Sequence, residues 1–166
     1  MVHGPVLRFR ALGPGDQQLL WDLLHVALWD PPPAPLRPRA ILAHPDVRIY
    51  AEEWGRRKGD VGVVAMIGRG ATPAGGAWMR LVPGGRGLAF VDEETPQLGI
   101  AMLPAFQNKG HGEQLLRAAM DVGRASGHRR IALTVHPENP AVRLYERCGF
   151  RKVDLRRNYH LMLATL

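Results

Sequence analysis

The sequence predicts a single mixed-sheet α/β domain. Apolar runs typical of strands and amphipathic stretches typical of helices alternate along the chain in the order β-α-α-β-β-β-α-β-α-β-β. No break in composition divides the chain, so residues 1–166 are expected to form one domain. The length of 166 residues is ordinary for one domain, and an apolar content of 46% is enough for a buried core.

The first part of the chain predicts a strand followed by a helix. Leu7, Phe9 and Ala11 alternate with arginines over residues 6–12, which indicates a half-buried strand. Asp16 is expected to cap the next helix. The apolar stripe of that helix comprises Leu19, Leu20, Leu23, Leu24, Ala27 and Leu28.

A proline-rich connection at residues 30–38 separates this helix from shorter elements, because proline cannot continue a helix. Residues 39–43 predict a short helix, and residues 46–54 predict another that is capped by the aspartate at its start. The apolar runs at residues 61–67 and 75–82 predict two strands paired as a hairpin.

Strands and helices continue to alternate in the second half of the chain, where residues 88–94 fit either a strand end or a loop. A helix is expected over residues 112–125. Asn139 followed by Pro140 predicts the start of another helix, which Gly149 ends. The expected strands span residues 97–103, 130–135, 150–154 and 159–166.

The chain carries a net charge of +7, which allows a nucleic-acid partner. Its basic residues are almost all arginines, and they are scattered along the sequence rather than gathered in one stretch. A nucleic-acid-binding domain is therefore the weaker interpretation. A basic surface also suits an anionic cofactor or an acidic substrate.

No apolar segment is long enough to span a bilayer, and residues 1–5 lack the pattern of a signal peptide. We therefore expect a cytoplasmic protein without a membrane partner. The single cysteine, Cys148, excludes an internal disulfide and is consistent with a reducing compartment.

A glycine-rich turn at residues 107–113 leads into the predicted helix that follows it. Gly110 and Gly112 leave backbone amides unobstructed at the positive end of a helix, an arrangement that suits phosphate or pyrophosphate. The turn lacks the terminal Gly-Lys-Ser/Thr of a P-loop and the three-glycine spacing of the dinucleotide fingerprint. On these residues alone, an anion site and a purely structural turn are both open.

Two motifs in this region resemble those of the GNAT acetyltransferase superfamily. The first is Gln107-x-x-Gly110-x-Gly112, preceded by an apolar run that ends at Pro104, and it resembles the acetyl-CoA-binding motif. The second comprises Asn139, Ala141, Leu144, Tyr145, Gly149 and Phe150. The two motifs stand in the order of the family, with a helix and a strand between them. The resemblance covers the chain from Gln97 to about residue 153.

The resemblance implies a central, mostly antiparallel sheet of about six to seven strands flanked by about four helices, splayed between the fourth and fifth strands. It also implies transfer of an acetyl group from acetyl-CoA to a primary amine, by direct attack in a ternary complex and without a metal. The acceptor is expected to be a small-molecule or peptide amine, and the protein a monomer or homodimer.

The resemblance assigns roles to particular residues. The backbone of Met102 and Leu103 would pair with the pantetheine arm, and an amide near Met102 would polarise the acetyl carbonyl. Asn139 would contact the pantetheine, and Tyr145 would act as the general acid for the departing thiolate. The pyrophosphate would be bound by the amides of Gln107, Asn108, Lys109, Gly110, His111, Gly112 and Glu113. Two structural alternatives stay open, a helix cap for Asn139 and a core position for Tyr145.

One position departs from the family pattern. Many members carry a glutamate ten residues before the first motif as the general base for the amine, and this chain has Gln97 there. Glu93, Glu94 and His136 are the alternatives for that role, and an amine held neutral by its pocket needs no strong base. The same departure motivates a second hypothesis, a non-catalytic acyl-CoA-binding or regulatory module.

The acceptor is expected between the first helical region and the predicted hairpin. Aromatic rings and a fixed cation suit an aromatic or carboxylated amine. An ordinary core position is the alternative for each of these residues, which are Trp29, Tyr50, Trp54, Trp78 and Arg80.

Overall fold

The computed structural model describes residues 6–166, so the prediction made for residues 1–5 lies outside the described part of the chain. Seven strands form one sheet in the order β1-β2-β3-β4-β5-β7-β6. The strands are β1 (Leu7–Ala11), β2 (Val61–Ile67), β3 (Thr72–Arg80), β4 (Gln97–Met102), β5 (Arg130–Val135), β6 (Arg151–Arg156) and β7 (Tyr159–Thr165).

The described residues also form four α-helices, and the element order agrees with the predicted one. They are α1 (Gln17–Ala27), α2 (Pro45–Arg48), α3 (Gly112–Ala125) and α4 (Ala141–Arg147). Short 3-10 helices connect several elements, namely η1 (Pro14–Asp16), η2 (Arg39–Ala43) and η3 (Pro104–Phe106).

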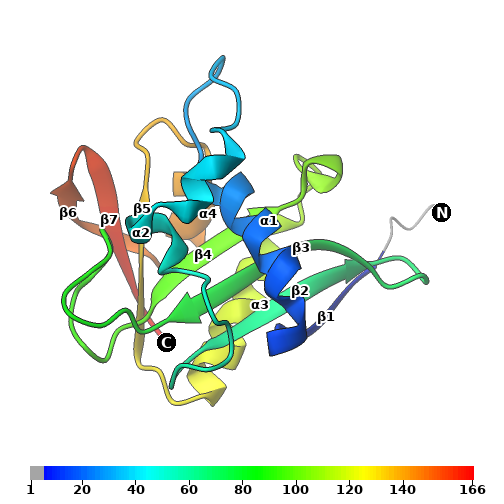
Figure 1. Cartoon of the computed structure of the whole chain (residues 1–166), viewed down its shortest axis with the longest axis horizontal. Coiled ribbons are helices and arrows are strands. Elements are labelled where there is room, and N and C mark those ends of the chain that lie inside the picture. Colours follow the sequence, from blue (N-terminus) through cyan, green and yellow to red (C-terminus); the bar gives the residue numbers. More distant parts are fainter. Residues whose placement is uncertain (1–5) are drawn as a thin grey trace.

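The sheet is antiparallel at every pairing except β4 with β5, which run parallel. Those two strands share one register pair, Gln97 with Ala132, and the Ala132 amide donates to the Pro96 carbonyl at 3.1 Å. Beyond this point the strands diverge, as Figure 1 shows. The expected mostly antiparallel sheet, splayed between its fourth and fifth strands, is confirmed.

Strand β2 is buried on both faces, and its successive residues point to opposite sides of the sheet. Val63 and Ala65 belong to a core shared with α3, whereas Val64 and Met66 belong to a core shared with α1. Figure 1 shows α1 lying across the strands in front, with α3 behind them. The second core contains Leu20, Leu23 and Leu24, which lie on the predicted stripe of α1.

The prediction of a half-buried first strand is wrong for most of β1. Leu7 is partly buried, but Phe9 is 38% exposed and Ala11 is exposed. The physical reason is position, since β1 is the edge strand that pairs only with β2. An apolar alternation reveals which residues share a face, but not whether another layer covers that face.

Two predicted helix caps are also corrected. The Asp16 carboxylate accepts the Gly13 amide at 2.8 Å and pairs with Arg10, so it closes the turn before α1 and makes no cap bond to that helix. Before α2, the His44 ring accepts the amide of Asp46 at 3.1 Å, so His44 is the cap.

Several element bounds differ from the predicted ones. Helix α2 ends at Arg48 rather than continuing to residue 54, and strand β3 begins at Thr72 rather than at residue 75. Residues 88–94, which fitted a strand end or a loop, form two turns joined by an irregular segment.

Candidate functional site

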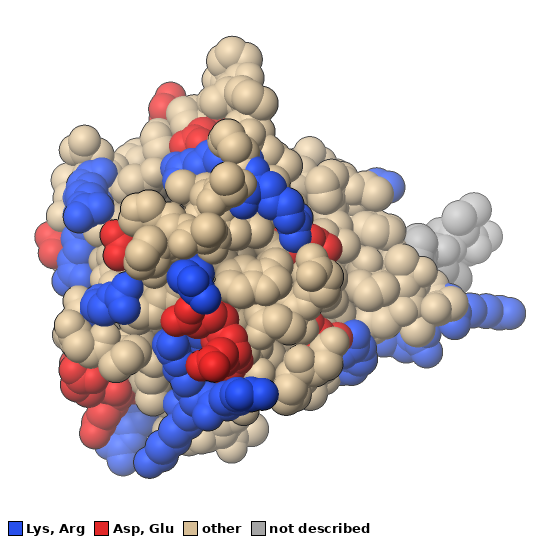
Figure 2. All heavy atoms as spheres, in the orientation of Figure 1, with Lys and Arg blue, Asp and Glu red and all other residues tan. Residues whose placement is uncertain are grey.

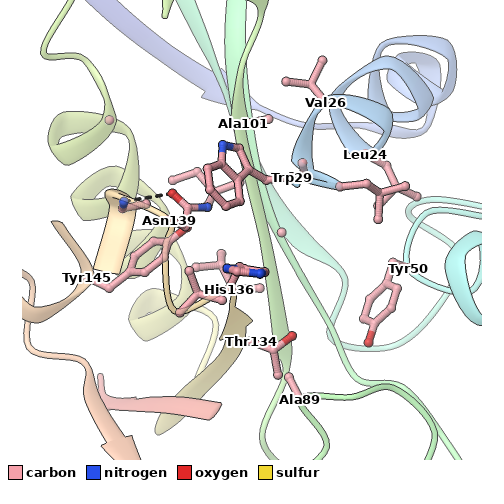
Figure 3. Close-up of a pocket in the computed structure, with 18 of the residues that line it drawn as sticks. Leu24, Val26, Trp29, Tyr50, Ala89, Ala101, Thr134, His136, Asn139 and Tyr145 are labelled. Atoms are coloured by element: carbon pink, nitrogen blue, oxygen red, sulfur yellow. Dashed lines mark hydrogen bonds between the residues drawn. The ribbon is translucent and has the colours of Figure 1, made fainter. Parts of the chain in front are cut away.

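A cavity of about 1040 Å³ opens where β4 and β5 diverge. Segments far apart in the sequence line it: the C-terminal end of α1, residues 85–89, strand β4, the glycine turn, the end of β5 and the start of α4. Figure 3 shows Asn139 and Tyr145 on one side of this space, with Leu24 and Tyr50 on the other. The splay of the sheet therefore creates a cleft that reaches both halves of the chain.

The glycine turn, residues 107–113, forms one wall of the cavity. Asn108 and Gly110 have positive φ angles of 60° and 79°. Glycine adopts this conformation most readily, which suits the glycine at position 110. The Gln107 amide group donates to the Met102 carbonyl at 3.0 Å and thereby ties the turn to the end of β4. Among the described residues, no hydrogen bond occupies the backbone amides of residues 108–113. These amides are donors at the start of a 14-residue helix, which suits an anion.

The outer edge of β4 faces the splay. The Leu103 amide donates to the Ala74 carbonyl at 2.8 Å, on the β3 side. In an antiparallel pair the backbone groups of successive residues point to alternate sides, so the Met102 amide points away from β3. Met102 lines the cavity and Leu103 does not. The predicted backbone contact to an extended ligand therefore suits Met102 better than Leu103.

Glu113 brings a negative charge to the glycine turn, and two arginines offset it. Its carboxylate lies 3.0 Å from the Arg147 guanidinium and 3.5 Å from that of Arg117. The hydrogen bond from Arg147 is the main reason that the pKa of Glu113 lies below its usual value. The surroundings of the turn are thus cationic despite the carboxylate.

Tyr145 lies at the end of the cavity that α4 forms. Its ring packs against Phe150 with 5.8 Å between ring centroids, and the residue is 8% exposed. Burial alone raises the pKa of Tyr145 to about 12. The phenol therefore keeps its proton at neutral pH. Tyr145 lines the cavity although it also belongs to the core, so its core position does not separate it from the cleft.

Asn139 precedes α4 and also lines the cavity. Its side-chain oxygen accepts the Ala141 amide at 2.9 Å, the dashed bond in Figure 3. This is the predicted capping contact. It leaves the side-chain NH₂ group as the donor that remains for a ligand.

The side chain of Gln97 is buried and held at both ends. Its oxygen accepts the Tyr50 hydroxyl at 2.9 Å, and its NH₂ group donates to the Arg86 carbonyl at 3.0 Å. The Tyr50 hydroxyl in turn accepts the Leu88 amide at 3.1 Å. Gln97 thus fastens residues 86–88 to the start of β4. It is a structural tie, which explains why a neutral amide is suited to this position.

None of the three alternative bases is well placed. The Nδ1 atom of His136 accepts the Glu138 amide at 3.0 Å, so the remaining ring nitrogen of the neutral imidazole carries the proton. Glu93 and Glu94 are exposed and do not line the cavity. The carboxylates of residues 6–166 that line the cavity are those of Asp46 and Glu113, and each lies within 4.0 Å of an arginine. The remaining imidazole in the lining, His111, belongs to the glycine turn.

We use the name acceptor half for the part of the cavity on the side where the sequence predicts the acceptor. It is lined by the end of α1, the turn between β6 and β7, residues 85–89, Arg37, Asp46, Val47 and Tyr50. Trp29, Tyr50 and Trp78 line the cavity as the sequence suggested. His136 joins Trp29 to Tyr159 through ring contacts of 5.6 and 5.7 Å between centroids.

Two of the residues expected in the acceptor half belong to the core instead. Trp54 is 2% exposed, and its ring nitrogen donates to the Leu12 carbonyl at 2.8 Å. Arg80 is fully buried and pairs with Asp60 at 2.9 Å. It also donates to the carbonyls of Ile49, Glu52 and Glu53. Arg80 therefore holds residues 49–53, which include the lining residue Tyr50, and does not itself line the cavity.

Sequence reasoning did not identify several residues that line the cavity. Three come from loops and two from the ends of strands, and nothing in their local sequence distinguishes them from residues outside the cavity. They are Arg37, Arg86, Thr134, Arg157 and Tyr159. Of the predicted cofactor-binding residues, only Leu103 and Lys109 do not line the cavity.

The distribution of charge bears on the nucleic-acid interpretation. On the face in Figure 2, Lys and Arg side chains form separate groups with Asp and Glu between them, unlike the continuous basic stripe typical of nucleic-acid binding. Within residues 6–166, no group of three or more His, Cys, Asp or Glu is placed to hold a metal ion. No helix in this part of the chain is long and apolar enough to cross a membrane.

Comparison with known families agrees with this geometry. Residues 21–150 match the family model described as the acetyltransferase (GNAT) family. The chain belongs to this family. The resemblance found in the two sequence motifs is thereby confirmed, and the splayed sheet is the fold that it implied.

Among curated relatives, the chain is similar to the ribosomal protein bS18-alanine N-acetyltransferase of Haemophilus influenzae. The two are 37% identical over 68 residues, which are 41% of this chain and 47% of the relative. A counterpart from Bacillus subtilis, described as putative for the same activity, is 31% identical over 75 residues, or 45% of this chain and 50% of that protein. The matches thus span about half the length of these relatives.

Solved structures show the same fold over nearly the whole chain. A GNAT acetyltransferase from Streptococcus pneumoniae superposes with a TM-score of 0.64 at 21% identity, covering 97% of this chain and 100% of that one. The PaiA N-acetyltransferase of Thermoplasma acidophilum, solved with coenzyme A, gives 0.64 at 14% identity and covers 97% and 99%. At these identities the likeness concerns the fold alone.

Proposed function

We propose that this GNAT protein transfers the acetyl group of acetyl-CoA to a primary amine by direct attack in a ternary complex. One observation carries the proposal: a single cavity joins the unpaired amides of the glycine turn, the outward-facing Met102 amide and the protonated Tyr145. Acetyl-CoA, when bound, supplies an acetyl thioester. The residues of the chain fit that group, since donors for an anion and a proton donor lie in one cleft.

Each residue has a defined task in this proposal. The amides of residues 108–113 bind the pyrophosphate at the start of α3, and the Met102 amide polarises the acetyl carbonyl. The Asn139 NH₂ group contacts the pantetheine. Tyr145 holds the proton that the departing sulfur takes up.

Cys148 does not act as an acyl carrier in this proposal. It is buried, it does not line the cavity, and burial raises the pKa of its thiol. A thiol with a raised pKa is a poor nucleophile at neutral pH because the thiolate is the reactive form. The amine therefore attacks the thioester directly.

The acceptor half lacks a well-placed base, so the amine is expected to react in its neutral form and to lose its proton to water. We predict that kcat/KM rises with pH up to the pKa of the acceptor amine itself. Because the Tyr145 pKa is raised to about 12, its deprotonation does not lower the rate at any pH below about 10. Profiles for two acceptors of different amine pKa would check this. A limb near pH 6.5 shared by both acceptors would instead reveal a histidine base.

The first test of the proposal follows free thiol release from acetyl-CoA over a panel of amines. We expect saturating acetyl-CoA to raise the thermal unfolding temperature, and at least one amine to give turnover. Absence of both effects would refute the proposal.

A non-catalytic acyl-CoA-binding module is the second candidate, favoured by the buried, hydrogen-bonded Gln97 in place of a glutamate. It predicts tight CoA binding together with no acetylation of any amine in the panel. Sustained turnover with any acceptor would exclude it.

Replacing Gly110 by alanine is expected to weaken CoA binding. Gly110 has a φ of 79°, and a side chain there disfavours the turn by about 1–2 kcal/mol. We expect a rise in the CoA dissociation constant of roughly tenfold. Gly127 is a matched control, because it has a φ of 92° and equally open surroundings at the end of α3.

Calorimetric titration of both alanine variants with CoA distinguishes a loss of CoA affinity from a loss of stability alone. Both should lose similar stability, and only Gly110→Ala should lose affinity. Equal CoA affinity for the two variants would contradict a role of the turn in binding.

We also propose that residues 1–166 act as one domain and that the protein is cytoplasmic and monomeric or homodimeric. One continuous seven-stranded sheet that includes both β1 and β7 supports a single unit. The lone buried thiol of Cys148 supports a reducing compartment. Size-exclusion chromatography with light scattering measures the oligomeric state.

A further inference from the structure

We propose that the acceptor amine carries a carboxylate and that Arg157 binds this carboxylate in the acceptor half of the cavity. The inference rests on the proposed acetyl transfer and specifies its substrate class. The carboxylate belongs either to a free amino acid or to an acidic residue of a peptide. The chemistry that Arg157 recognises is the same in both.

Arg157 lines the cleft, and its positive charge has no partner among the described residues. It lies in the turn between β6 and β7 with a φ of 49°, and its side chain is exposed. In residues 6–166 its guanidinium makes no ion pair within 4.0 Å and no hydrogen bond to another side chain or carbonyl. A guanidinium offers a planar set of donors that matches a carboxylate.

The turn that carries Arg157 is held in place beside the cleft. The neighbouring Arg156 guanidinium donates to the carbonyls of Leu88 and Phe90, the first at 3.1 Å. Residues 85–89 line the cavity and are themselves tied to β4 through Gln97. Arg157 is therefore presented from an anchored turn and not from a loose hairpin end.

The other charges of the acceptor half are largely compensated. Arg37 forms an ion pair with Asp30 at 2.9 Å. Arg86 lies 3.7 Å from Asp46, whose side chain is 72% exposed. Among the described residues, Asp46 is the only carboxylate lining this half. Because Arg37 and Arg86 each have an aspartate partner, the uncompensated charge of this half is that of Arg157, which attracts an acidic acceptor and repels a polycation.

Aromatic rings complete the recognition surface. Trp29, His136 and Tyr159 form a contiguous cluster, and Tyr159 lies two residues after Arg157. Figure 3 shows the Trp29 and His136 rings close to Asn139 in the middle of the cleft. An apolar ring surface beside an arginine suits an acceptor with a carboxylate at one end and a less polar body.

The test compares acceptors that differ only in the carboxylate. Phenylalanine is paired with phenylethylamine, and lysine with cadaverine. For peptides, alanyl-glutamate amide is paired with alanyl-glutamine amide. Spermidine represents the polycations. For each acceptor, kcat/KM is measured with the native protein, with Arg157→Gln, with Arg157→Lys and with Arg69→Gln. Arg69 is an exposed arginine of the β2–β3 turn that does not line the cavity.

We expect the carboxylated member to be preferred in at least one pair. For that member, Arg157→Gln should lower kcat/KM roughly tenfold to a hundredfold, the range expected for a charged hydrogen bond. For the partner without the carboxylate, kcat/KM should change by less than about twofold, because that acceptor lacks the group that Arg157 contacts. Arg157→Lys should retain part of the preference, and Arg69→Gln should behave as the native protein.

Three outcomes overturn the inference. A preference for spermidine or for the uncarboxylated members excludes the substrate class while leaving the acetyl transfer intact. An equal loss for both members of a pair in Arg157→Gln shows that Arg157 does not contact the carboxylate. Absence of turnover with every amine refutes the acetyl transfer and the inference with it. The amino-acid and peptide pairs distinguish the two sources of the carboxylate.

Discussion

Replacing Tyr145 by phenylalanine is expected to lower kcat about a hundredfold, within the range for losing a general acid. The substitution keeps the ring contact with Phe150 and removes only the hydroxyl. Burial raises the pKa of Tyr145 to about 12, so the native phenol is protonated at every pH at which the protein is assayed. The CoA dissociation constant should change little, because the anion donors lie in the glycine turn.

For the same variant, single-turnover kinetics measures the rate of acetyl transfer, and CoA titration measures the dissociation constant. Cys148→Ala is the matched control on the adjoining helix end, since that thiol is buried and outside the cavity. It should keep near-native turnover. An unchanged kcat in Tyr145→Phe would remove Tyr145 from the acid role, and loss of activity in Cys148→Ala would favour an acyl-enzyme.

Replacing Arg80 by methionine is expected to reduce the free energy of unfolding by about 3–5 kcal/mol, because it leaves the buried Asp60 charge without its partner. Both side chains are at most 1% exposed. The variant also loses the donors to the carbonyls of Ile49, Glu52 and Glu53. For a chain of this size, the fall in melting temperature should be about 10 °C or more.

Urea denaturation of Arg80→Met beside Arg10→Met checks this expectation. Arg10 also pairs with an aspartate, Asp16, at 2.8 Å, but its side chain is 43% exposed. An exposed pair contributes about 1 kcal/mol or less. Similar losses for the two variants would contradict the assigned role of Arg80. The loop that Arg80 holds includes Tyr50, so the acceptor KM should also rise.

Local sequence was sufficient to predict the turn and the helix that form one side of the cleft. Gly110 is needed where the turn adopts a positive φ, and Asn139 makes a capping bond within two residues of its own position. Tyr145 lies one turn further along the same helix. Helix starts and tight turns depend on interactions between neighbouring residues, so they can be predicted from local sequence without knowledge of the fold.

Burial was less predictable, because it depends on which layers meet. Phe9 has the same apolar character as the core residues and is exposed, since β1 lies at the edge of the sheet. Trp54 and Trp78 are both buried tryptophans, yet only Trp78 lines the cavity. Composition could not separate these cases, since a ring in the core and a ring in a pocket wall have the same hydrophobicity.

The element order, the conformation of the glycine turn and the helix with its tyrosine were thus determined by the sequence alone, because each rests on periodicity or on contacts between near neighbours. The acceptor half was decided only by tertiary structure. Arg37, Arg86 and Arg157 come from three separate connections and meet there because the sheet opens between β4 and β5. Gln97 became a tie rather than a base because Tyr50 and residues 86–88 pack around it. Long-range packing, which leaves no local sequence signal, sets the charge and the shape of the acceptor wall.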